Sequence, residues 1–548
     1  MSNKSDYIGI TIGPIIDTLL LSSSPAGLWG ASYLFSYIAK SLAEKLINDG
    51  IGEEEFVCPV LDDETKQIIQ EAQGVGLFHD RIIFRAKANE MEIVQKAIAW
   101  IKNKIADKFY EDFINTSSSD EGYEKYQVFM DNYLQIHAVK TSVQDKDNPI
   151  LVLGPLLDAL ELMKSVNTKE NKNFILKMLV NQEALNQNTM EDSDEESGKN
   201  YYMKSSFLTE EVVRNSSWQL LENGKVKNIS DIAGNGIEGA DTDKKKYQYY
   251  AFVQSDGDNL TAVLKSIQQF GKGINIHDSI RDFSKTCFKY SQKAAEAIHA
   301  YGGVTIYAGG DDLLFLAPLE SGEKTIFNLV EELEEVFREE FKLYLFNNKG
   351  KPSGLSVSFG AAIHHESYPL YESLKRAYML LERAKEGKKH GLAVELMKRS
   401  GQKNGIHVKE FSENLTYQQM IQLFHEIWDL DDNFLRSLTQ KFNLHEIEIK
   451  EALSKQKASA GGDSYIVYNL VENLFSNRHK SIFDESKDDK KESLKAERKY
   501  IRAVTDLLIK LESTNEIQCL NKDKADSLAC LESVIRIMKF YQEERGDA

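Results

Sequence analysis

Apolar residues recur along the first part of the chain with two different spacings, which predict helices and strands in alternation. The run Leu28–Ile47 repeats its apolar residues every three to four positions, as a helix with one buried face does. A second helix is predicted over Met91–Ile114. Short runs of apolar and β-branched residues predict strands over Tyr7–Gly13, Phe56–Val60, Leu77–Arg85 and Tyr133–Val139. Helices that return between short strands predict a small α+β sandwich.

A second block of the same kind extends from Lys246 to Arg399. It opens on the apolar run Tyr249–Gln254, a predicted strand, which leads directly into the polar segment Ser255–Asn259. Helices are predicted next, over Leu260–Phe270 and Ile276–Tyr301. Two short apolar runs follow, Val304–Ala308 and Leu313–Ala317, and they flank a Gly-Gly-Asp-Asp turn at positions 309–312. This arrangement predicts a β-hairpin with two carboxylates at its tip.

The other segments are predicted to be helical or polar. The stretch 146–245 has mostly helical patterns and contains the acidic tract Asn186–Asn200, which is too polar to bury a core. After Arg399 the patterns predict helices only, over Tyr417–Leu430, Phe434–Phe442, Tyr465–Phe475, Glu497–Leu511 and Leu528–Gln542. We therefore predict four domains: an α+β domain over 1–145, a mainly helical domain over 146–245, a second α+β domain over 246–400 and a helical domain over 401–548.

Composition narrows the classes of protein that fit this pattern. Of the 548 residues, 42% are hydrophobic and 28% are charged, which excludes global disorder. The formal net charge of −18 argues against a free-standing nucleic-acid binder, so any contact with nucleic acid should be local or shared with basic partners. The sequence shows neither a membrane-length apolar run nor a signal-peptide pattern, and we expect a cytoplasmic protein. The four cysteines include no C-x-x-C pair, so we expect neither a zinc site nor structural disulfides.

The candidate chemistry lies where the strand end meets the hairpin. Asp256 follows the predicted strand, and Asp311 and Asp312 occupy the hairpin tip. If the strand lies beside the hairpin, these carboxylates converge, and they repel one another unless a cation lies between them. Mg²⁺ or Mn²⁺ would suit such oxygen ligands, and Mg²⁺ usually keeps waters and substrate phosphates in its shell. Two such ions, ~3.5–4 Å apart, would activate an attacking hydroxyl and stabilise a departing pyrophosphate. Gly-Gly-Asp-Asp alone is also the composition of an ordinary turn.

The order of these features resembles the palm domain of nucleotide cyclases and polymerases. Downstream, Gly354–Ile363 is similar to the next palm strand, and Leu370–Gly391 is similar to the helix whose Ala-Lys step places a lysine near the triphosphate. In this chain that step is Ala384-Lys385, with Lys388 and Lys389 close behind it. A compact ammonium group suits phosphate as a point charge, although a solvated helix end has the same composition.

Four N-terminal stretches narrow the resemblance: Ile10–Pro14 (ITIGP), Leu28–Leu34 (LWGASYL), Phe78–Arg81 (FHDR) and Tyr133–Ile136 (YLQI). Together with Asp256-Gly257-Asp258 and the hairpin at 309–312, they resemble the large polymerase/cyclase subunit of type III CRISPR effector complexes, in its Cmr (III-B) branch. The hairpin is the specific part of this resemblance, and the N-terminal matches are looser.

The resemblance implies two ferredoxin-like palm domains and two helical domains, in a complex that uses a CRISPR guide RNA to sense target RNA. It implies that the second palm is a nucleotidyltransferase that converts ATP into cyclic oligoadenylates, which signal in antiviral defence. Asp256, Asp311 and Asp312 would be the catalytic carboxylates and would hold two Mg²⁺ or Mn²⁺ ions. The implied nucleotide-binding residues are Gly257, Asp258, Asn259, Gly309, Gly310, Lys385 and Lys388. The implied partners are the other subunits, the guide RNA and the target RNA, with no membrane.

Three departures from the family pattern affect what the resemblance implies. The HD nuclease domain of many relatives is expected to be absent, because the first palm begins at the N-terminus and His79-Asp80 lies in a strand-like stretch. The zinc-binding cysteines of the family are missing, and the loop Ser22–Gly27 is small and polar where relatives tend to be basic. Some nuclease-lacking members join AMP to S-adenosylmethionine, so this conjugate (SAM-AMP) stays an alternative product, with S-adenosylmethionine as co-substrate.

Two other functions compete with this interpretation. A diguanylate-cyclase-like enzyme also uses a Gly-Gly hairpin, but it usually has glutamate and phenylalanine where this chain has Asp312 and Leu313. Such an enzyme also does not need the N-terminal block. A non-catalytic scaffold subunit of an RNA-guided complex is the second alternative. The retained carboxylates argue against it, because a vestigial site need not keep all three.

Overall fold

The computed structural model describes residues 4–72, 74–87, 89–116, 122–163, 175, 218–222, 225–234, 248–270, 275–411, 414–426, 430, 432–458, 465–479, 488–520 and 526–542. The chain divides into two compact units, which we describe separately. The first comprises Met1–Glu238, Phe252–Val357 and Glu366–Lys375, and the second comprises Gly239–Ala251, Ser358–His365 and Arg376–Ala548. The predicted acidic tract Asn186–Asn200 lies outside the described residues, and the four predicted domain boundaries stay a prediction.

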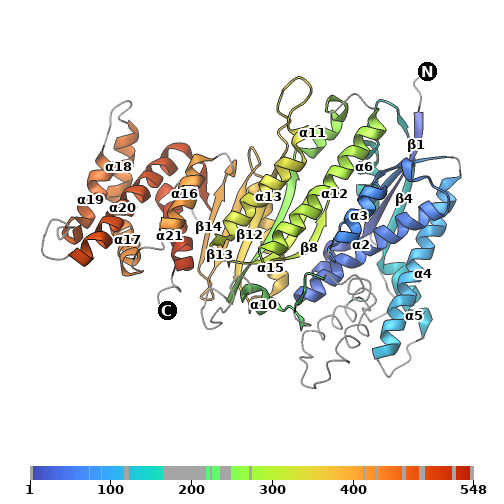
Figure 1. Cartoon of the computed structure of the whole chain (residues 1–548), viewed down its shortest axis with the longest axis horizontal. Helices are drawn as coiled ribbons and strands as arrows, with labels where there is room; N and C mark the ends of the chain where they lie inside the picture. Colours follow the sequence, from blue (N-terminus) through green and yellow to red (C-terminus); the bar gives the residue numbers. More distant parts are fainter. Residues whose placement is uncertain are drawn as a thin grey trace. The chain divides into compact units, whose positions relative to one another are not determined.

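The first sheet lies in the first unit and has four strands (Figure 1). They are β1 (Lys4–Gly13), β2 (Phe56–Cys58), β3 (Arg81–Ala86) and β4 (Gln135–Gln144). The order is β2-β3-β1-β4, and β1 pairs antiparallel with both β3 and β4. This central placement of the first and third strands is the ferredoxin-like order, so the predicted α+β sandwich is confirmed.

Helices α2 (Pro25–Asn48), α4 (Glu90–Thr116) and α6 (Pro149–Glu161) pack against this sheet. Gly9 of β1 faces α6, because a Cβ added there would lie 3.1 Å from Leu157 Cδ1. Alternate residues of a strand point to opposite faces, so Ile8 and Ile10 point away from α6, and both are fully buried. Apolar side chains therefore cover β1 on both faces.

The second sheet has seven strands in the order β15-β14-β13-β12-β7-β9-β8. The strands are β7 (Tyr249–Asp258), β8 (Val304–Gly309), β9 (Asp312–Pro318), β12 (Ser356–His365), β13 (Leu392–Met397), β14 (Lys403–Val408) and β15 (Ile517–Cys519). The part β12-β7-β9-β8 repeats the ferredoxin-like order of the first sheet. The predicted β8–β9 hairpin is confirmed, since its strands pair antiparallel from Val304–Leu316 to Gly309–Asp312.

Four helices connect the strands of this sheet within the first unit: α11 (Leu260–Lys265), α12 (Ile276–Ala300), α13 (Ile326–Glu340) and α14 (Lys342–Leu345). The side chain of Asn275 caps α12 by accepting a hydrogen bond from the Asp278 amide at 3.0 Å. Helix α12 packs on β8, β9 and α13. Its buried face thereby supports the hairpin.

Helix α15 (Leu370–Ala384) ends earlier than the predicted helix Leu370–Gly391. The backbone after it turns left-handed, with φ values of +81° at Gly387, +65° at Lys389 and +53° at His390. A Cβ at Gly391 would lie 2.1 Å from the Ala384 carbonyl oxygen, so the chain folds back closely onto the helix end. Lys385 is consequently the first residue beyond the helix.

The prediction that only helices follow Arg399 was wrong, because β14 and β15 extend the sheet in the second unit. Gly405 allows this extension, since a Cβ there would lie 2.8 Å from Leu520 Cδ1. The helices are α16 (Leu415–Glu426), α17 (Asp432–Leu444), α18 (Glu446–Ala458), α19 (Ile466–His479), α20 (Asp488–Thr514) and α21 (Ser527–Gln542). Among the helices that the structure describes, none is long and apolar enough to cross a bilayer.

Inside the first unit, one face of α12 binds the segment around β2. The Arg281 guanidinium donates to the carbonyl oxygens of Glu53 at 3.0 Å, Glu54 at 3.2 Å and Phe56. Two lysines further along the helix pair with acidic side chains, Lys285 with Asp62 at 2.5 Å and Lys289 with Glu64 at 2.7 Å. The Ala308 amide of β8 also donates to the Gly76 carbonyl at 3.2 Å. These contacts fix the hairpin against the first sheet's domain.

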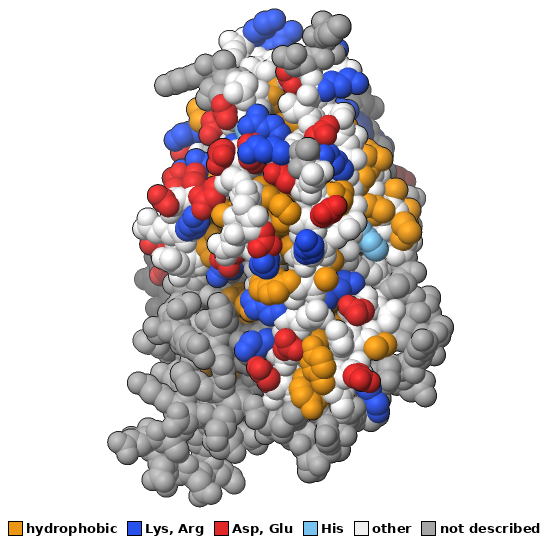
Figure 2. Space-filling view, turned by 90° about the vertical axis from the view of Figure 1, so that its right-hand side faces the viewer, with side chains coloured by type: hydrophobic (Ala, Val, Ile, Leu, Met, Phe, Trp, Pro, Cys, Tyr) orange, Lys and Arg blue, Asp and Glu red, His pale blue; other side chains and the backbone are white. Residues whose placement is uncertain are grey.

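Basic and acidic side chains are interspersed over the described part of the face in Figure 2. This face does not present one continuous basic surface of the kind that tracks a nucleic-acid backbone.

Candidate active site

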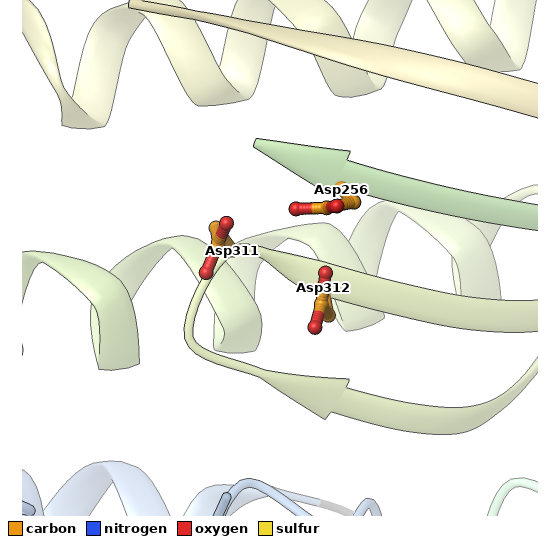
Figure 3. A group of neighbouring side chains, drawn as sticks. All are labelled: Asp256, Asp311 and Asp312. Atoms are coloured by element: carbon orange, nitrogen blue, oxygen red, sulfur yellow. The ribbon is translucent and has the colours of Figure 1, made fainter. Parts of the chain in front are cut away.

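Three carboxylates converge where β7 ends beside the β8–β9 hairpin (Figure 3). Asp256 lies near the end of β7, Asp311 lies in the turn, and Asp312 opens β9. One oxygen from each side chain lies within 4.8 Å of the others. The predicted convergence is therefore confirmed, although the chemical roles of these residues stay a prediction.

Glycines let the backbone of the two motifs approach one another. The Gly257 amide donates to Asp311 Oδ2 at 3.1 Å, and a Cβ at Gly257 would lie 2.7 Å from that oxygen. Gly310 has a φ of +73°, which an L side chain rarely adopts, and its carbonyl accepts a hydrogen bond from Ser291 Oγ of α12 at 3.2 Å. At Gly309, a Cβ would lie 2.1 Å from the Tyr307 hydroxyl. The hairpin tip therefore needs glycine at each of its two glycine positions.

We expect Gly257→Ala to displace the Asp311 carboxylate, because the new methyl group would also lie 2.3 Å from Leu260 Cδ1. Nucleotide turnover should fall by one to two orders of magnitude, because a displacement of a reacting group by about 1 Å can cost a factor of about 100. Steady-state kinetics and a thermal melt check this prediction. A Gly257→Ala variant that melts normally and keeps the original turnover rate would contradict it.

Burial and mutual repulsion disfavour the ionised forms of the hairpin carboxylates. Burial raises the pKa of Asp311 to about 6, against the opposing effect of hydrogen bonds from its own amide and from the Gly257 amide. The pKa of Asp312 lies well above its usual range. Burial is the largest cause, followed by the charge of Asp311 and then the charge of Asp80. Concentrated negative charge with raised pKa values is the setting that a divalent cation relieves. The donor set is all oxygen, which fits Mg²⁺ or Mn²⁺.

The raised pKa of Asp311 predicts a pH-dependent stability. Its folded value of about 6 exceeds the ordinary 3.8, so the folded chain holds the proton more tightly than the unfolded chain. Its contribution to metal-free stability is therefore present at low pH and is lost as the pH rises from about 4 to about 6. In EDTA, Asp311→Asn should raise the melting temperature more at pH 7 than at pH 4.5. An equal shift at both pH values would contradict the prediction.

Asp258 and Asn259 follow Asp256 in the sequence and connect the end of β7 to the start of β12 through hydrogen bonds. The Asp258 side chain is fully buried, and its Oδ2 accepts a hydrogen bond from Ser356 Oγ at 3.0 Å. Asn259 has a left-handed φ of +62°, and its Nδ2 donates to the Gly354 carbonyl at 2.7 Å. Both hydrogen bonds join the end of β7 to the start of β12. Sequence reasoning named Asp258 and Asn259 but not Ser356 or Gly354, because nothing in the pattern marks these partners.

Lys385 and Lys388 follow α15 in the second unit. Burial first, and then the charge of Lys389, lower the pKa of Lys385 to about 8. Lys388 is 80% exposed and pairs with Glu410 at 3.2 Å. Burial of an ammonium group is unusual on a solvated helix end, so Lys385 fits a functional role better than Lys388 does.

Asp80 is a further carboxylate that sequence reasoning did not assign to this site. Its backbone carbonyl accepts a hydrogen bond from the Ile12 amide at 2.9 Å, which fixes it at the end of β1. Burial raises its pKa, and its charge in turn raises the pKa of Asp312. His79 packs against Cys58 with its Nδ1 3.5 Å from Sγ, and burial lowers its pKa to about 4. The FHDR stretch was the sequence signal that could have pointed to Asp80. The effect of its charge on the pKa of Asp312 follows only from the fold.

Two family models match the chain, and each of them covers strands of one of the two sheets. Residues 249–393 match the model for Cas10/Cmr2, second palm domain, and these residues contain the three carboxylates. Residues 7–111 match the model for CRISPR-associated protein Cmr2, N-terminal. Over these two stretches the chain is similar to Cas10/Cmr2 proteins. Most of the second sheet lies in the stretch that matches the palm-domain model, and the predicted type III-B resemblance is confirmed.

The curated relative and the solved structures agree with this assignment. The CRISPR system Cmr subunit Cmr2 of Pyrococcus furiosus is 24% identical over 275 residues, which are 43% of this chain and 30% of the relative. A subunit of the type III-B Cmr-beta complex bound to cognate target RNA has a TM-score of 0.57 at 13% identity and covers 99% of this chain and 83% of its own. The apo state of that complex gives 0.54 at 12% identity, over 99% and 82%. These structures share the fold.

Proposed function

We propose that this chain is the signalling-nucleotide synthase of a type III-B CRISPR complex, where it transfers AMP from ATP to make cyclic oligoadenylates. The observation that carries the proposal is the convergence of Asp256, Asp311 and Asp312 within 4.8 Å inside a matched Cas10/Cmr2 palm domain. The N-terminal Cmr2 match favours this function over a diguanylate-cyclase-like enzyme, which does not need that domain. We further propose that the protein works in the cytoplasm with the other subunits, the guide RNA and the target RNA.

The carboxylates of Asp256, Asp311 and Asp312 would together hold two Mg²⁺ or Mn²⁺ ions. Bound ions would supply positive charge to the triphosphate and lower the pKa of the attacking hydroxyl. Asp311 is oriented for this role by the Gly257 amide, and the hairpin tip is oriented by Ser291. Gly309 and Gly310 carry no side chain that would keep the donor ATP from the backbone.

The remaining residues would bind and position the donor. Asn259 and Asp258 fix the end of β7 through Gly354 and Ser356, and so they border the phosphate site. Lys385 would neutralise triphosphate charge. An acceptor hydroxyl would attack the α-phosphate and give up its proton to solvent, a new P–O bond would form, and pyrophosphate would leave with the electrons of the broken bond between the α-phosphorus and the bridging oxygen.

We expect Lys385→Met to raise the KM for ATP about tenfold and to change kcat less, because a point charge on phosphate mainly strengthens binding. The pKa of about 8 adds a signature in pH. The ammonium loses its charge as the pH rises through 8, so ATP should bind more weakly above that value in the unmodified protein. In Lys385→Met this weakening should be absent. Titration of ATP at pH 7 and pH 9 checks both points, and identical pH profiles would contradict them.

The product decides between the proposed function and its alternatives. The assembled complex is incubated with target RNA and ATP, with and without S-adenosylmethionine, and the products are identified by mass spectrometry. We expect cyclic oligoadenylates in both samples. A product that needs S-adenosylmethionine would favour SAM-AMP from the same site, and a product from GTP alone would favour the diguanylate-cyclase-like enzyme. Co-purification with guide RNA and no nucleotide product would support a scaffold.

A further inference from the structure

One surface segment of the first unit exposes large apolar side chains. It comprises the short helix α14 and the turn that follows it, residues 342–354 between α13 and β12, and we call it the 342–354 loop. Leu343 is 65% exposed and Phe346 is 59% exposed. Apolar residues scattered singly over a surface are ordinary, whereas apolar side chains gathered on one element mark interaction sites. This pair, three positions apart, therefore calls for an explanation.

The 342–354 loop is ordered by its own hydrogen bonds. The Asn347 amide donates to the Lys351 carbonyl at 2.9 Å, and the Gly350 amide donates to the Asn347 carbonyl at 2.8 Å. Asn347 Oδ1 accepts from the amides of Lys349 at 3.0 Å and Lys351 at 3.1 Å. The Ser353 amide donates to the Leu345 carbonyl at 2.8 Å, which closes the loop. Binding of a partner costs the loop little conformational entropy, because its turn is already formed.

The charges of the loop are all positive in a chain that carries a net charge of −18. The sequence from Phe341 to His365 contains no aspartate or glutamate, and the loop presents Lys342, Lys349 and Lys351. Lys342 pairs with Glu339 of α13 at 3.6 Å. A complementary surface would therefore be apolar at its centre and acidic at its rim.

A protein fits this surface better than a nucleic acid does. Single-stranded nucleic acid binds through phosphates on lysines and bases stacked on aromatic faces, and Phe346 could serve that mode. Leu343 has no aromatic face, so its burial would gain nothing from stacking. An apolar protein pocket would bury Leu343 and Phe346 together, with the lysines at the rim, which is the usual anatomy of a protein interface.

The far end of the loop is joined to the strand that carries Asp256. The Gly354 carbonyl accepts from Asn259 Nδ2 at 2.7 Å, and Ser356 donates to Asp258 at 3.0 Å. The Asn348 amide also donates to the Gln269 carbonyl at 2.8 Å, beyond α11. A partner that holds the loop would therefore also hold the segment immediately after Asp256.

We propose that the 342–354 loop docks a protein subunit whose surface offers an apolar pocket with an acidic rim, and that docking stiffens the end of β7. The proposal rests on the proposed function, because the partner is one of the other subunits of the complex.

A binding titration tests the docking. The remaining subunits, assembled with guide RNA but without this chain, are titrated with the labelled full-length chain. Leu343→Ser with Phe346→Ser should weaken binding at least tenfold, and Lys349→Glu with Lys351→Glu should weaken it at least threefold, more at low salt than at high salt. The matched control is Ile16→Ser, which removes a side chain that is 62% exposed in α1 (Ile15–Leu19). It should bind like the unmodified chain.

Hydrogen exchange tests the stiffening. Docking should slow amide exchange over residues 252–258 in the unmodified chain. Asn259→Ala keeps the exposed face of the loop but removes its hydrogen bond to Gly354, so this variant should dock normally and show less slowing.

Each other outcome decides against a defined part of the account. If the unmodified chain joins the assembly and the loop variants bind equally well, the inference is overturned and the proposed function stands. If Ile16→Ser weakens binding as much as the loop variants do, the assignment to the loop is overturned. A loss confined to labelled target RNA, with subunit binding unchanged, would make the loop a nucleic-acid site instead. If the unmodified chain does not join the assembly at all, the proposed function and the inference fail together.

Discussion

Asp256→Asn is expected to abolish nucleotide transfer, with a fall in turnover of at least ~10³-fold, as for the loss of a preorganised charged group at a reacting phosphate. An amide keeps the size of the side chain but removes the negative charge that the three-carboxylate site would use to hold cations. Because Asp256 lies within 4.8 Å of Asp311 and Asp312, the change also relieves repulsion among them. The metal-free variant should therefore melt at the same temperature as the unmodified protein or higher. Turnover assays and thermal melts in EDTA measure both effects.

The matched control is Asp282→Asn, which removes an exposed carboxylate from α12, the helix that supports the hairpin. This variant should keep full turnover. If Asp256→Asn keeps measurable turnover within tenfold of the original, the three carboxylates are not the reacting site. If it loses turnover only because it unfolds, the melting temperature will show this.

Arg281→Ala is expected to lower the free energy of unfolding of the first unit by ~3 kcal/mol, because hydrogen bonds to charged groups contribute about 1.5–3 kcal/mol each and the loss leaves carbonyl groups unpaired. The guanidinium donates to the carbonyls of Glu53, Glu54 and Phe56, which belong to the segment leading into β2. The same change should loosen the hairpin against the first sheet's domain. Turnover with ATP should then fall more than ATP affinity does, since Asp311 and Asp312 on the hairpin would lose their alignment.

Lys289→Ala is the matched control on the same face of α12. Its side chain is 40% exposed, and its ammonium group pairs with Glu64 at 2.7 Å. An exposed ion pair of this kind contributes only about 0–1 kcal/mol, so the variant should unfold almost as the original does. Urea unfolding of the two variants measures the difference. Equal destabilisation by both would show that the carbonyl contacts of Arg281 have no special role.

The sequence predicted the elements that have long and regular patterns. The helices Leu28–Ile47 and Met91–Ile114 correspond to α2 and α4, and the hairpin around positions 309–312 corresponds to β8 and β9. It did not predict β15, since three residues are too few to show a period. It also extended α15 to Gly391, because that range came from the similarity to the palm helix, whereas the backbone is left-handed from Gly387 and the helix ends at Ala384.

In the candidate site, the residues that carry a local motif were predictable from the sequence, and those that depend on distant contacts were not. Asp256, Asp311 and Asp312 were predictable because each stands at a strand end with a local motif. Ser356, Gly354 and Asp80 were not, because their contacts with the site join segments far apart in the sequence. Only the strand order β12-β7-β9 brings the first two beside the end of β7.

Diffraction from crystals of the protein soaked with Mn²⁺ and a non-hydrolysable ATP analogue tests the central claim most directly. The account predicts anomalous peaks between the carboxylates of Asp256 and Asp312, with the analogue's triphosphate bound to the same ions. Mn²⁺ found elsewhere, or a triphosphate bound away from these side chains, would contradict it.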